Sequence, residues 1–131
     1  MGYHVHITRA PHTFYENEGR EISESEWLAL VAADPELRLA TPADPYYFTG
    51  MVLWLGHEDA DSCGPWFAWG DGNVYTKRPT SVVLTKMLAI AGLLGARVQG
   101  DLGHVYRADG QLVDINGAQV GLDWRTHWDK I

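Results

Sequence analysis

Polar and apolar residues alternate over residues 3–8, and this alternation predicts a β-strand with one apolar face. A helix is predicted next, over Ser23 to Ala33, because Ser23 and Glu26 have the spacing of a capping box. Asp34-Pro35 marks its end, since the residue before a proline avoids the α-helical region. The chain is therefore expected to begin with a strand and a capped helix.

The clearest hairpin signal is Asp71-Gly72, a pair preferred by type I′ turns, between the segments 66–69 and 74–77. A two-residue turn fixes the register of the strands that it joins, and here it puts Trp66 and Tyr75 on the same face. The register leaves open whether these two aromatic side chains lie in the core or on the outside.

Further elements lie on either side of this hairpin. Short apolar segments predict strands over 36–39 and 51–55. Thr80 or Ser81 can cap a second helix with a broad apolar face, which runs to about Leu94 and is followed by a glycine. This second helix is expected to be largely buried.

Two more turn pairs, Asp109-Gly110 and Asn116-Gly117, predict a three-stranded meander over residues 104–121. Residues 122–131 are expected to be a tail or a short helix. The sequence contains no repeat and no long linker, so a single domain is predicted over residues 1–131. The order β-α-β(3–4)-α-β meander predicts an α+β fold, with two helices packed on one face of a largely antiparallel sheet.

Composition supports a globular domain. Of the 131 residues, 46% are hydrophobic and 21% are charged, which is enough apolar surface for a core. The single cysteine, Cys63, cannot form an internal disulfide. No apolar run approaches the ~20 residues of a membrane-spanning helix, and the N-terminus lacks the layout of a secretory signal. These features predict a cytoplasmic protein.

The charge is strongly negative, with 17 acidic and 10 basic side chains and a net charge of −7. Nucleic acid and anionic membranes require a basic surface, so neither is expected to be a direct partner. Two acidic clusters lie before residue 62: the first begins with Glu16, Glu18 and Glu21 and continues with Glu24 and Glu26, and the second is Glu58, Asp59 and Asp61. Each cluster is either a solvated face that aids solubility or a surface that attracts a basic partner.

The sequence offers few groups for catalysis. His4 and His6 are two residues apart on a predicted strand, so both rings leave the same face, as a metal pair requires. A metal site needs at least one more ligand, which the sequence does not place beside them. The nucleophile-elbow, phosphate-loop and zinc-protease motifs are all absent from the sequence. No enzymatic activity and no cofactor are therefore predicted.

The N-terminal segments carry a resemblance. Residues 3–10, residues 17–23 and the start of the first helix resemble small uncharacterised bacterial proteins that begin with a similar strand and capped helix. Residues 94–100 resemble the same proteins, so the likeness covers about the first hundred residues. In size and charge the chain also resembles the immunity proteins of bacterial toxin systems. This resemblance implies a protein partner but assigns no site residue.

The leading hypothesis is a noncatalytic protein-binding module, an immunity protein or antitoxin that binds and occludes a basic toxin domain. The chain has six tryptophans and six tyrosines, residue types that anchor protein interfaces, and Trp66 and Tyr75 are the predicted anchors. The acidic side chains predicted to steer the partner are Glu16, Glu18, Glu21, Glu58, Asp59 and Asp61. The alternative is a small metal-binding protein or metal-dependent enzyme that uses His4 and His6. A homo-oligomer that buries its own aromatic surface is a third possibility.

Overall fold

The computed structural model of the chain describes residues 3–56, 65–121 and 123–127. Its elements are, in chain order, β1 (His4–Thr8), α1 (Glu24–Ala33), β2 (Leu37–Leu39), β3 (Val52–Trp54), β4 (Trp66–Gly70), β5 (Asn73–Lys77), α2 (Ser81–Leu94), β6 (Arg97–Gly100), β7 (Val105–Tyr106), β8 (Leu112–Val113) and α3 (Trp124–His127). None of these helices is long and apolar enough to cross a bilayer.

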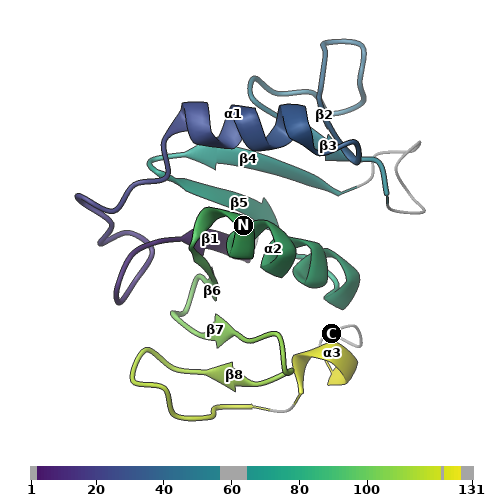
Figure 1. Ribbon diagram of the computed structural model, residues 1–131. Coiled ribbons are helices and arrows are strands. Elements are labelled where there is room, and N and C mark those ends of the chain that lie inside the picture. Colours follow the sequence, from purple (N-terminus) through teal and green to yellow (C-terminus); the bar gives the residue numbers. More distant parts are fainter. Residues whose placement is uncertain (1–2, 57–64, 122, 128–131) are drawn as a thin grey trace.

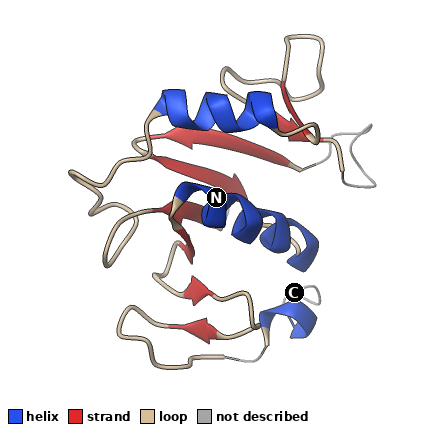
Figure 2. Cartoon of the chain, in the orientation of Figure 1, coloured by secondary structure: helices blue, strands red, loops and turns tan. Residues whose placement is uncertain are grey.

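The strands form one sheet in the order β2-β3-β4-β5-β1-β6-β7-β8. Each neighbouring pair of these described strands is antiparallel. The N-terminal strand β1 lies inside the sheet between β5 and β6, and α1 and α2 cover one face of the sheet (Figure 1 and Figure 2). The predicted α+β fold, with two helices on one face of an antiparallel sheet, is confirmed.

Both long helices begin where the sequence predicts. At α1 the Glu26 backbone N–H donates to Ser23 Oγ, and Glu26 Oε1 accepts from the Ser23 backbone N–H, each at 3.1 Å. At α2 the Thr80 hydroxyl accepts from the Val83 N–H. Gly95 ends α2 in the left-handed conformation, with φ of 62°. The capping box, the second cap and the glycine stop are thus all present.

The β4–β5 hairpin has the predicted turn and register. Asp71 and Gly72 have φ values of 53° and 81°, and a type I′ turn requires both to be positive. Gly70 pairs with Asn73 next to the turn, and Ala68 pairs with Tyr75 two positions further along, as predicted. Side chains on each strand therefore alternate between the helix-covered face and the opposite face, which we call the open face.

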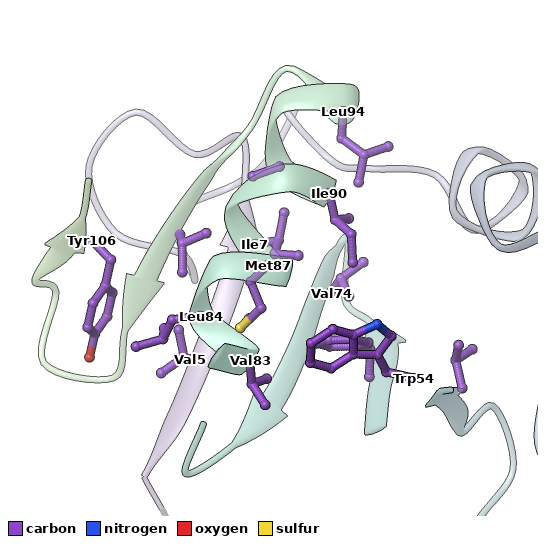
Figure 3. Close-up of a cluster of buried hydrophobic side chains, with 14 of the residues drawn as sticks. Val5, Ile7, Trp54, Val74, Val83, Leu84, Met87, Ile90, Leu94 and Tyr106 are labelled. Carbon is purple, nitrogen blue, oxygen red and sulfur yellow. The ribbon is translucent and has the colours of Figure 1, made fainter. Parts of the chain in front are cut away.

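The core lies between the sheet and the helices. Val5 and Ile7 of β1 and Val74 of β5 point toward α2 in Figure 3, and all three are fully buried. α2 contributes Leu84, Met87 and Ile90 to the same cluster, while α1 contributes Trp27 and Val31. The alternation predicted for residues 3–8 thus places the apolar face of the first strand in the core.

The sheet continues beyond β1 through a strand that the sequence did not predict. β6 pairs with β1, so it joins the hairpin to the C-terminal strands. Its residues Arg97, Val98, Gln99 and Gly100 put only one bulky apolar side chain toward the core, which leaves too weak a pattern to detect. The predicted meander over 104–121 is shorter than expected: β7 and β8 have two residues each, and Gln119 adds a single bridge to Val113.

Residues 123–127, the described part of the C-terminal segment, pack onto the domain through Trp124. Trp124, the first residue of the short helix α3, is 2% exposed and donates its indole N–H to the Arg107 carbonyl at 2.6 Å. The ring also packs edge-on against buried Tyr106. Of the two predicted forms of residues 122–131, a short helix is the one present over the part of this segment that the structure describes.

Candidate functional site

The open face carries the two histidines and the two predicted anchors. His4 and His6 alternate with the buried residues of β1, so both rings lie on this face. Tyr75 stands opposite His6 on the neighbouring strand. Trp66 meets Tyr75 edge to face, with ring centroids 5.9 Å apart. Each of these four side chains is partly exposed, so the aromatic anchors lie on the outside of the sheet.

These rings belong to a row of aromatic side chains that crosses the open face. Phe48 packs edge-on against Trp66 at 5.0 Å, and Tyr75 lies 5.9 Å from His4 and 6.5 Å from His6 between ring centroids. His6 stacks on Phe14 at 3.6 Å, and Tyr15 continues the row at 5.3 Å from Phe14. We call this the aromatic row: Phe48, Trp66, Tyr75, His4, His6, Phe14 and Tyr15.

One end of the aromatic row forms the floor of an open hollow of about 570 Å³. Its remaining walls come from the turn and from the loop after β1, through Asn17, Asp71 and Asn73. The Asn17 amide donates to the Asp71 carbonyl at 2.7 Å, which ties the loop to the turn. Tyr15, which lines the hollow, is 70% exposed. We call this feature the aromatic hollow.

The first acidic cluster borders the aromatic hollow. Glu16, Glu18 and Glu21 are exposed and lie in the loop between β1 and α1 that also supplies Phe14, Tyr15 and Asn17. The Ile22 N–H donates to the Gly72 carbonyl at 2.8 Å, which holds the end of this loop against the turn. Acidic and aromatic side chains far apart in the sequence are thereby combined on one surface. The second predicted cluster, Glu58, Asp59 and Asp61, lies outside the described residues.

The carboxylate of Asp101, which directly follows β6, is hydrogen-bonded to the side chain of His6 and to the backbone of His4. Its Oδ1 lies 2.9 Å from His6 Nε2, and its Oδ2 accepts the backbone N–H of His4 at 2.8 Å. Burial lowers the pKa of His6 below its ordinary value and outweighs the opposing effect of Asp101. The pKa of Asp101 is also lowered, because the hydrogen bonds from His6 and His4 outweigh its burial. At neutral pH, His6 is thus a neutral imidazole that donates a hydrogen bond to the Asp101 carboxylate.

The position of Asp101 beside the two histidines is relevant to the alternative that His4 and His6 bind a metal ion. His4 Nδ1 is 3.7 Å from Asp101 Oδ2, so a carboxylate lies where a third ligand was sought. The carboxylate is engaged in hydrogen bonds, however, and no group of three or more His, Cys, Asp or Glu among the described residues is placed to hold a metal ion. What the geometry offers is a hydrogen-bonded floor for the aromatic hollow.

Comparison with family models, with curated proteins and with solved structures finds no match to this chain. The resemblance of the N-terminal segments to small bacterial proteins, and of the size and charge to immunity proteins, therefore stays a prediction.

Proposed function

We propose that the chain is a noncatalytic protein-binding module whose aromatic hollow and acidic loop receive a basic surface of another protein. We further propose that this partner is a basic toxin domain, which the chain occludes in the cytoplasm as an immunity protein does. The chain resembles such proteins in its small size and acidic charge.

The observation that carries the proposal is the attachment of the acidic loop to the hairpin turn beside the aromatic hollow. Asn17 and Ile22 bind the two carbonyls of the turn, so the loop that carries Glu16, Glu18 and Glu21 is held against the turn that borders the aromatic hollow. Exposed carboxylates accelerate the encounter with a basic surface, and aromatic side chains in a hollow slow its release. A merely solvated acidic face would not require the aromatic rings next to it.

The lining of the aromatic hollow also suits a cationic side chain. Tyr75, Phe14 and Tyr15 offer ring faces, and Asp71 adds an exposed carboxylate at the rim. The neutral state of His6 adds no positive charge to the floor. An arginine or lysine of the partner is attracted both by the rings and by the carboxylates.

The test is co-purification from the source cells at low and at moderate salt, followed by identification of stoichiometric partners. We expect one basic protein whose recovery falls as salt rises, because exposed charges are screened. The same purification with Tyr15→Ala should lose this protein, whereas Leu93→Ala, an exposed residue on the helix-covered side, should retain it. Recovery of no stoichiometric basic protein, or equal recovery with both variants, contradicts the proposal.

A further inference from the structure

Arg97 of β6 is an arginine without a carboxylate partner in the described part of the chain. Three other arginines each bind an acid: Arg9 with Glu26, Arg38 with Asp44 and Arg125 with Asp123. Arg97 instead uses Nη2 to donate to the carbonyl of His12 at 2.8 Å. Its Nε is sealed from solvent and has no hydrogen-bond partner.

The burial of this guanidinium is unfavourable without a counter-charge. Arg97 is half-buried, and this partial burial lowers its pKa because part of the guanidinium is removed from water with no carboxylate beside it. An exposed arginine such as Arg20 avoids this cost because water solvates it. Arg97 therefore has no carboxylate partner among the described residues, and an anion that reaches the N–H groups at the tip of its guanidinium would supply the missing negative charge.

A cavity of about 510 Å³ lies beside Arg97. β6 and β7 pair Val98 with Tyr106, so one position further along Arg97 stands opposite Arg107. Both arginines line the cavity, and Asn116 and Gly117 of the last turn close another side of it. Two arginines thus line one cavity in a protein with a net charge of −7.

We propose that this cavity is a binding site for a small oxyanion, a phosphate or carboxylate group held by Arg97 and Arg107. The planar guanidinium presents several N–H donors in a geometry that matches two oxygens of such a group. This site is separate from the aromatic hollow, because the two share no lining residue. It therefore does not depend on the proposed function.

Among the described residues, Asp114 is the one acid that lines the same cavity, and it gives the proposal a sharp test. Its Oδ1 accepts the backbone N–H groups of Asn116 and Ala118 at 2.8 and 3.0 Å, so it is used to build the turn. Its negative charge nevertheless opposes an anion in the cavity. Asp114→Asn keeps an oxygen for the turn and removes this repulsion, so it should strengthen anion binding.

The experiment is a titration of the full chain with sodium phosphate, followed by the backbone amide NMR signals, against sodium chloride at the same ionic strength. We expect saturable shifts at residues 97, 107, 116 and 117 with phosphate and none with chloride. Arg97→Gln should weaken binding by at least about tenfold, the loss expected for a charge-assisted hydrogen bond. Arg107→Gln, at an exposed position that does not threaten folding, should weaken it in the same direction.

A matched control and a second anion complete the test. Arg20→Gln removes an exposed positive charge outside the cavity and should leave the titration unchanged. Titration with acetate distinguishes a preference for carboxylate from one for phosphate, and saturation by either supports the site. Shifts that are equal in chloride, or that fail to saturate with both anions, overturn it. Saturation unaffected by both Arg97→Gln and Arg107→Gln also overturns it.

Discussion

The imidazole ring of His6 stacks face to face on the phenyl ring of Phe14, with centroids 3.6 Å apart and planes at 10°. His6 belongs to a central strand, whereas Phe14 belongs to the loop that carries the first acidic cluster. The stack therefore adds a contact between this loop and the sheet, besides the loop's hydrogen bonds to the turn. These contacts hold Phe14 and Asn17 in place as walls of the aromatic hollow.

The first prediction concerns pH and His6. The pKa of this residue is lowered in the folded state, so the unfolded chain binds a proton more readily than the folded chain. The neutral His6 ring therefore favours the folded state. Its contribution to the free energy of unfolding should be fully present above about pH 6.5, the ordinary histidine pKa, and should decrease as pH falls toward and through the folded-state pKa. Denaturant unfolding between pH 7 and 5 measures it.

The control for this prediction compares two variants. His6→Gln removes the titrating ring and should flatten the decrease in stability over this range. His12→Gln changes an exposed histidine and should leave the slope as in the wild type. A His6→Gln slope equal to that of the wild type would show that the buried imidazole is not its source.

The second prediction concerns the contact between the acidic loop and the hairpin turn. Gly72 has φ of +81°, and a Cβ there would lie 2.7 Å from Glu21 Cβ and 2.8 Å from Asn17 Nδ2. Gly72→Ala should therefore lower the free energy of unfolding more than Gly117→Ala, which has a similar φ of +88° but open space around it. We expect about 1 kcal/mol for Gly117→Ala from backbone strain alone, and a larger loss for Gly72→Ala.

Chemical denaturation of both glycine variants measures this difference. Equal losses would mean that the loop yields to the added methyl group without cost. The turn would then not hold the acidic loop in place.

The third prediction concerns the C-terminal segment. Trp124 is 2% exposed and hydrogen-bonds the Arg107 carbonyl, so it is part of the core and not a free anchor for a partner. Trp124→Ala should reduce the free energy of unfolding by about 3–5 kcal/mol, as for other buried aromatic side chains. Thermal unfolding followed by circular dichroism checks this, and a loss under about 1 kcal/mol contradicts the packing described.

The fourth prediction separates the proposed function from the metal-binding alternative. If the chain is a noncatalytic protein-binding module, protein purified without an affinity tag should contain no stoichiometric metal by elemental analysis. Wild type should also match a double variant, His4→Ala with His6→Ala, in metal content. A stoichiometric metal that the double variant loses would restore the alternative and make Asp101 its third ligand.

Local signals predicted much of this fold because they act within a few residues. The capping box at Ser23 and the turn at Asp71-Gly72 depend on neighbours in sequence, and both are present. The turn also fixes the register that brings Trp66 and Tyr75 together. Position on a strand was likewise sufficient to put His4 and His6 on one face.

The candidate site was less predictable because it depends on contacts between distant segments. Phe14 and Phe48 lie in loops with no periodic pattern, so nothing in the sequence indicates that they pack on the open face. Asp101 was missed because β6 itself was missed, and its partners are more than ninety residues away. A polar residue at the end of a strand beside β1 is the signal that would have found it.

The most direct test of the central claim is the affinity of the co-purified basic partner for the wild type and for variants of the aromatic hollow, measured by calorimetry. Tyr75→Ala should weaken binding by about 30-fold, the ~2 kcal/mol typical of an aromatic anchor, and Tyr15→Ala should weaken it in the same direction. Leu93→Ala, on the helix-covered side, should bind as the wild type does. Unchanged affinity in both tyrosine variants would contradict the claim that the aromatic hollow receives the partner.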